Sequence, residues 1–180
     1  MRTVSVSWDK SGGRFTALGK YPGQAIAINA PAAPNEDREP RGFSATELML
    51  AGAGACAAWD VVEIMRKRRA QISGLDVTVE GDQQSDPPWT YRRIALHFRF
   101  QGDGLRDTVM ARVVRLSVVR YCSVISTLAG VAAIEATVEL VAGDGTSSGR
   151  RHVELALPAQ PLPQHERPLG DEDEAPATEQ

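Results

Sequence analysis

The chain has 180 residues, long enough for one domain with a sizeable hydrophobic core. Hydrophobic residues make up 42% and charged residues 24%, as in an ordinary globular protein. The net charge of −3 argues against nucleic acid as a partner, because nucleic-acid-binding proteins usually have a strongly basic face.

The N-terminal sequence MRTVSVSWDK has no apolar run long enough for a signal peptide. No segment reaches the roughly 18 apolar residues that suggest a membrane span. We therefore expect a cytoplasmic protein with no membrane partner. In a reducing compartment, the two cysteines are more often reactive or inert thiols than a permanent structural disulfide.

The first part of the chain predicts a three-stranded antiparallel meander. Apolar and polar side chains alternate in three short segments, as in half-buried strands, and glycine-containing turns separate them. These segments are residues 3–8, 14–18 and 24–29. A polar, proline-rich loop is expected over residues 30–42.

A long helix is predicted to begin at Ser44. Ser44 and Glu47 have the spacing of a capping box, and the basic run at 66–69 suits the negative pole of the helix dipole. The middle of the helix, AGAGACAA (51–58), contains two glycines, each costing about 1 kcal/mol relative to alanine. Because close packing against other backbone would explain them, we expect this helix to be central and buried.

The rest of the folded part is predicted to contain three strands and a second helix. The strands are expected at 75–80, 92–100 and 134–141, the loop at 81–89, the helix at about 105–128, and one more short strand is conceivable within 152–157. This order predicts an α+β fold with mostly antiparallel sheet. We assign residues 1–143 to one domain and residues 144–180 to a flexible, acidic C-terminal tail.

Cys56 is predicted in the middle of the first helix and Cys122 near the end of the second. They are 66 residues apart, so the sequence alone does not bring them together. Both could be buried small hydrophobes. Alternatively, the arginines at 112, 115 and 120 favour a thiolate at Cys122, and the small residues around Cys56 leave room for a ligand.

Other kinds of catalytic or metal site have little support in the sequence. There is no CxxC motif, and the three histidines, His97, His152 and His165, lack ligand spacing with either cysteine, so no metal is expected. No GxSxG elbow supports a serine hydrolase.

Two segments resemble the OsmC/Ohr family of osmotically inducible and organic hydroperoxide resistance proteins. GFSATELMLAGAGACAAWDVVEIMRKRR (42–69) is similar to the family's central helix, and VVRLSVVRYCSVISTL (113–128) is similar to its second, cysteine-bearing helix. Asp60-Val61-Val62 and the strand around His97 are most similar to the OsmC-like branch of YhfA type. The resemblance covers about residues 1–141 and implies an OsmC-like fold with antiparallel sheets.

The resemblance implies an intertwined homodimer with two active sites at the subunit interface, and we expect no cofactor. By this resemblance, Cys56 is the peroxidatic and Cys122 the resolving cysteine of an organic hydroperoxide reductase. Such an enzyme would act in the oxidative stress response, and a dithiol such as a lipoylated protein would reduce it. Family peroxidases also use an arginine and a glutamate; Arg14 lies at about the position of the arginine, and the carboxylate of Glu47 lies one residue after the position of the glutamate. The glutamate position itself, ten residues before Cys56, holds Thr46.

Alternatives to these roles remain open. Glu47 is also explained by its capping box, and Arg14 by an exposed strand. Four residues are candidates to line an apolar substrate site, although each could be ordinary core: Phe43, Met49, Trp59 and Tyr121. The functions to be separated are a thiol-dependent peroxidase, a non-enzymatic ligand-binding or redox-sensing protein, and a structural dimer with inert thiols.

Overall fold

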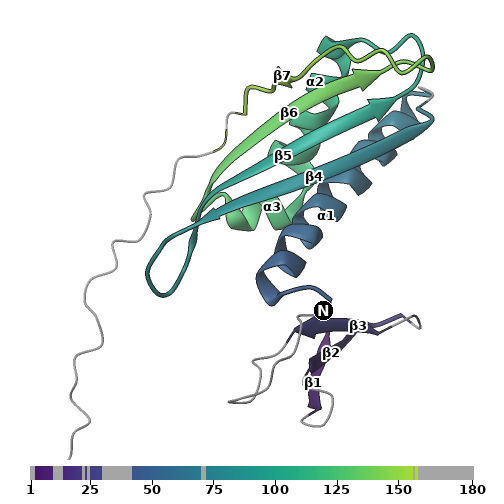
Figure 1. Cartoon of the computed structure of the whole chain (residues 1–180). Helices are drawn as coiled ribbons and strands as arrows, with labels where there is room; N and C mark the ends of the chain where they lie inside the picture. Colours follow the sequence, from purple (N-terminus) through teal and green to yellow (C-terminus); the bar gives the residue numbers. More distant parts are fainter. Residues whose placement is uncertain are drawn as a thin grey trace, which may run out of the picture.

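The computed structural model describes residues 3–9, 14–21, 23, 25–29, 42–69, 72–155 and 157. In this part of the chain the elements follow the predicted order of strands and helices (Figure 1). They are β1 (Ser5–Asp9), β2 (Arg14–Leu18), β3 (Ile26–Asn29), α1 (Ala45–Lys67), β4 (Gly74–Gln83), β5 (Tyr91–Gln101), α2 (Asp107–Leu116), the π-helical turn η1 (Ser117–Tyr121), α3 (Ser123–Leu128), β6 (Ala133–Val141) and β7 (Arg151–His152). The predicted α+β class is confirmed.

The N-terminal strands form the predicted meander as a separate small sheet. Its order is β1-β2-β3, and both strand pairs are antiparallel. Phe43 links this sheet to the rest of the chain, since it pairs with Ile28 and its carbonyl accepts a hydrogen bond from the Asn29 amide at 2.8 Å. Figure 1 shows the small sheet beside the N-terminal end of α1, apart from the larger sheet.

The predicted capping box at the start of α1 is present. The Glu47 amide donates to Ser44 Oγ at 3.1 Å, and the Ser44 amide donates to Glu47 Oε2 at 2.7 Å. By length and composition α1 could cross a membrane, in contrast to the expectation from the sequence. However, its buried residues Ala53, Ala57 and Val61 belong to the hydrophobic core, and the helix contacts β4 and the segment α2–α3. We therefore describe α1 as a helix that packs one face against the core; contrary to the expectation of a buried helix, much of the rest of it, including Gly52 and Trp59, is exposed.

The larger sheet has the order β4-β5-β6-β7. β4 pairs antiparallel with β5, and β7 pairs antiparallel with β6, whereas β5 and β6 are parallel. The parallel pair arises because α2, η1 and α3 carry the chain back across the sheet before β6 begins. β4 extends to Gln83, so the predicted loop 81–89 was placed too early in the chain.

One face of the larger sheet carries the core. Alternate residues of β5 point to this face, and Ile94, Leu96, Phe98 and Phe100 are at most 1% exposed. The helices cover this face with side chains that include Val114. The opposite face is polar, with an ion pair between Arg93 and Glu135 at 3.1 Å and a hydrogen bond between His97 and Glu139 at 3.0 Å.

Part of the segment assigned to the C-terminal tail contacts the larger sheet. β7 lies at residues 151–152, within one residue of the short strand considered from the sequence. Val153 is 2% exposed, and its amide donates to the Ala136 carbonyl at 2.9 Å. The predicted domain boundary at residue 143 precedes these contacts. The acidic residues of 161–180 lie outside the described part of the chain.

Candidate functional site

The two cysteines lie together in the folded chain. Their Sγ atoms and a carboxylate oxygen of Asp60 all lie within 4.8 Å of one another. Both cysteines are free thiols, Cys56 half-buried and Cys122 buried at 1% exposure. Folding therefore places two sulfurs that are distant in sequence close enough to form a bond after small side-chain movements.

A break in the second helical region determines where Cys122 lies. The predicted continuous helix 105–128 is wrong, because the π-helical turn η1 separates α2 from α3. The Cys122 amide donates to the Ser117 carbonyl at 2.8 Å, five residues earlier, and Cys122 itself is extended with φ −71° and ψ 103°. Cys122 is thus the N-cap of α3, and single π-turns of this kind occur often at functional sites.

Ser117 ties this turn to the helix that carries Cys56. Ser117 is fully buried, and its hydroxyl donates to the Ala57 carbonyl at 2.8 Å. Ala57 directly follows Cys56 and is itself buried. Because the hydroxyl is buried, this hydrogen bond takes the place of its hydrogen bonds to water. The bond thereby fixes the position of η1, next to Cys122, relative to α1, which carries Cys56.

The environment of Cys122 favours the protonated thiol. Burial raises the pKa of Cys122 to about 12, and a hydrogen bond with the Cys56 side chain adds to this effect. The Ile125 amide, which donates to Cys122 Sγ at 3.5 Å, acts in the opposite direction but is weaker. The expectation that nearby arginines favour a thiolate here is wrong, because those at 112, 115 and 120 are exposed and burial dominates.

Asp60 is the third member of the cluster. It follows Cys56 by four residues on α1, which places both side chains on one face of the helix. Its Oδ2 atom is buried and has no hydrogen-bond partner in the described part of the chain, and burial raises the pKa of its carboxyl group. These three groups each offer one ligand atom, which is one fewer than the four protein ligands of a structural zinc site.

Within this chain, Arg14 and Glu47 lie apart from the cysteine cluster. Arg14 is exposed on β2 in the small sheet, beside the N-terminal end of α1 (Figure 1). Glu47 is exposed, and its carboxylate accepts hydrogen bonds from the Ser44 amide and hydroxyl, which lower its pKa. Nine residues of α1 separate Glu47 from Cys56, a rise of about 14 Å and a rotation of about 180°.

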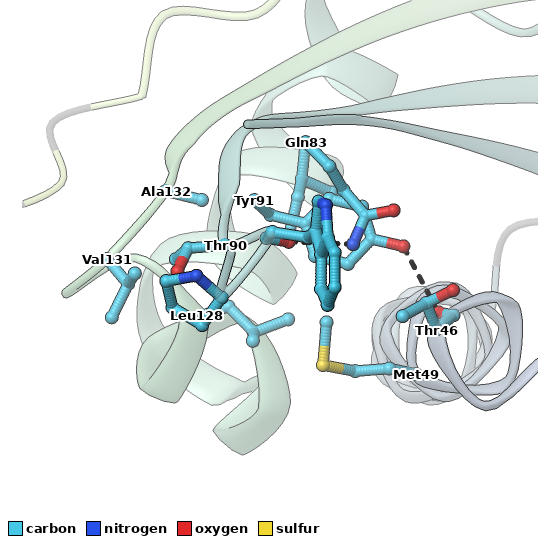
Figure 2. Close-up of a pocket in the computed structure, with 11 residues that line it drawn as sticks. Thr46, Met49, Gln83, Thr90, Tyr91, Leu128, Val131 and Ala132 are labelled. Carbon is cyan, nitrogen blue, oxygen red and sulfur yellow. Dashed lines mark hydrogen bonds between the residues drawn. The ribbon is translucent and has the colours of Figure 1, made fainter. Parts of the chain in front are cut away.

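The four residues predicted to line a substrate site do not share one hollow. Met49 reaches into a hollow of about 500 Å³, together with Thr46 and Tyr91 (Figure 2). Phe43 lines a second hollow, of about 480 Å³, against β4. Tyr121 lines a third, of about 420 Å³, which also contains Asp60, and Trp59 is 72% exposed on α1. Of these three hollows, the one with Tyr121 and Asp60 adjoins the cysteine cluster, through Asp60.

Reasoning from the sequence missed two residues of this site. Asp60 was noted only as part of a family resemblance, although a carboxylate one helical turn after a cysteine in an apolar helix was a usable signal. No such signal in the sequence pointed to Ser117, because its role depends on the π-turn and on the packing of α1 against that turn.

The OsmC-like protein family matches residues 36–147. Protein YhfA of Escherichia coli is 36% identical over 99 residues, which cover 55% of this chain and 74% of YhfA.

Solved structures share the fold. An OsmC-like protein from Mycoplasma pneumoniae has a TM-score of 0.65 at 21% identity, covering 78% of this chain and 97% of that one. An organic hydroperoxide resistance protein OsmC from Legionella pneumophila has a TM-score of 0.57 at 16% identity, covering 77% and 96%. With the family match spanning more than half of its length, this chain belongs to the OsmC-like protein family.

Proposed function

We propose that this protein is a thiol-dependent peroxidase that reduces organic hydroperoxides in the oxidative stress response. The observation that carries the proposal is the position of Cys56 Sγ and Cys122 Sγ within 4.8 Å of each other. The half-buried Cys56 is the more accessible thiol and the better candidate for attack on a substrate.

The reaction would proceed through two bond exchanges. The Cys56 thiolate attacks the distal oxygen of the hydroperoxide, the O–O bond breaks, and the alkoxide leaves as an alcohol after taking a proton, so Cys56 becomes a sulfenic acid. Cys122 then attacks the Cys56 sulfur, an S–S bond forms, and the hydroxyl leaves as water. An external dithiol, for example a lipoylated protein, would reduce the disulfide by exchange.

The relatives support the proposed peroxidase function only in part. The Legionella neighbour is named for organic hydroperoxide resistance, but at 16% identity it shares the fold alone with this chain. The more similar YhfA has a name that states no activity. The cysteine geometry therefore carries the proposal.

One equivalent of cumene hydroperoxide should convert the reduced protein to an intramolecular disulfide. We expect the intact mass to fall by about two hydrogens per chain, because a sulfenic acid condenses with the second thiol. Thiol titration under denaturing conditions should count two thiols before treatment and none after it. Two titratable thiols remaining after treatment would refute the peroxidase function.

A second candidate function is ligand binding or redox sensing without turnover. The positions of Arg14 and Glu47, away from Cys56 within one chain, favour it. Peroxide consumption with dihydrolipoamide separates the two functions, because a sensor would form the disulfide once without sustained consumption.

We also propose that the chain acts as a homodimer. The small sheet exposes large apolar side chains, among them Val6 at 59% and Trp8 at 60%, and α1 exposes Trp59 beside small residues. A second copy would bury these surfaces and could bring its Arg14 near this chain's Cys56.

Light scattering coupled to size exclusion should give twice the chain mass of 19.4 kDa. Trp8→Glu, which places a charge on the exposed apolar face, should shift the mass toward the single chain. A wild-type mass of one chain at all concentrations would contradict the dimer.

A further inference from the structure

We propose that Asp60 is a catalytic residue that accepts the proton of the Cys122 thiol while Cys122 attacks the oxidised Cys56. This inference rests on the disulfide cycle proposed above. It assigns a role to a carboxylate that lies within 4.8 Å of both reacting sulfurs.

Cys122 needs a base if it is to act as a resolving thiol. With a pKa raised to about 12 by its burial, it is almost entirely protonated near neutral pH, whereas the thiolate is the nucleophilic form. Its 1% exposure also limits proton transfer directly to bulk water. The proton must therefore pass to a group inside the cluster.

The structure offers Asp60 for this transfer. Its buried Oδ2 makes no hydrogen bond in the described part of the chain, so it is available to a thiol proton. Burial raises the pKa of the Asp60 carboxyl group above its ordinary value, which makes its ionised form a stronger base. The other titratable groups at Asp60 are Cys56, Cys122 and those lining the adjoining hollow, namely Glu63, Lys67, Arg68 and Tyr121.

A purely structural role would not explain this carboxylate. A half-buried carboxylate whose Oδ2 atom is buried without a hydrogen bond costs stability, and an amide or an apolar side chain of similar size would cost less. We therefore expect Asp60→Asn to keep or raise the free energy of unfolding, which separates the proposed role from a folding defect.

The step balances without an added reactant. Cys122 Sγ–H gives its proton to the Asp60 carboxylate, and its electron pair forms the bond to the Cys56 sulfur. The S–O bond of the sulfenic acid breaks, and the departing hydroxide takes the proton back from Asp60 to leave as water. Asp60 ends the step ionised, as it began.

The test uses the reduced full-length protein and dithiobis(nitrobenzoate), so that it does not depend on peroxide. The reagent forms a mixed disulfide with Cys56 and releases a first nitrothiobenzoate anion; attack by Cys122 then releases a second. Stopped-flow absorbance resolves both phases. Asp60→Asn should slow the second phase by about a hundredfold or more, the range of general base catalysis, without slowing the first.

The pH profile gives a readout that a structural role would not move. In the wild type, the rate of the second phase should level off once Asp60 is ionised. In Asp60→Asn it should keep rising with pH, because Cys122 must then ionise by itself. Asp60→Glu, which retains a carboxylate, should recover part of the rate.

Glu63→Gln is the matched control, since it removes a carboxylate that lies on the same helix and lines the same hollow. It should leave both phases unchanged. A second phase at the wild-type rate in Asp60→Asn, an equal slowing in Glu63→Gln, or no second release in the wild type would each overturn the proposal. A wild type that resolves the mixed disulfide but is inert to cumene hydroperoxide would refute the peroxidase function and leave the role of Asp60 standing.

Discussion

Cys56→Ser is expected to abolish the reduction of organic hydroperoxides, lowering the rate of peroxide consumption with dihydrolipoamide by about 10³-fold or more. The physical reason is the loss of the nucleophile itself, because a serine hydroxyl does not ionise in the range where a thiol does. Loss of cumene hydroperoxide, followed with a ferrous-iron colour assay, measures the effect.

Cys122→Ser should block the second step of the reaction, the formation of the disulfide, and leave the oxidation of Cys56 intact. Cys56 should still be oxidised by one equivalent of peroxide, but the sulfenic acid should persist, and dimedone should trap it as an adduct at residue 56. The wild type should give little of this adduct, because the neighbouring Cys122 consumes the sulfenic acid. Equal peroxide consumption by Cys56→Ser and the wild type would exclude Cys56 as the peroxidatic residue.

Phe98→Ala is expected to destabilise the protein by about 3–5 kcal/mol, a large part of the stability of a single domain. Phe98 is fully buried at the centre of β5, where it lies between Val77 of β4 and Val138 of β6. Its removal leaves a cavity that the paired strands on both sides cannot close. Urea denaturation followed by circular dichroism measures the change in the free energy of unfolding.

Tyr21→Ala provides the control, because it deletes a similar aromatic ring whose residue is 80% exposed. Its effect should stay within about 0.5 kcal/mol. If Phe98→Ala cost no more than Tyr21→Ala, the larger sheet would not form the core as described.

Much of the secondary structure could be read from local patterns. Alternating side chains located the strands to within about three residues, and the serine and glutamate at 44 and 47 located the start of α1. These features depend on neighbours within a few positions, so the sequence contains what is needed to infer them. The same reasoning failed at η1, since the apolar residues of the segment 105–128 keep mostly helical spacing although a π-turn interrupts the helix.

The amino-acid sequence was enough to infer the fold class, the two helical segments that carry the cysteines and, through resemblance, the family. The folded chain was needed to show that Cys56 and Cys122 meet, that Asp60 joins them, and that Arg14 lies on the small sheet. The reason is that a thiol's reactivity depends on burial and on neighbours contributed by distant segments. Ser117, which bonds across 60 residues to the main chain beside Cys56, is such a neighbour, and no local pattern reveals it.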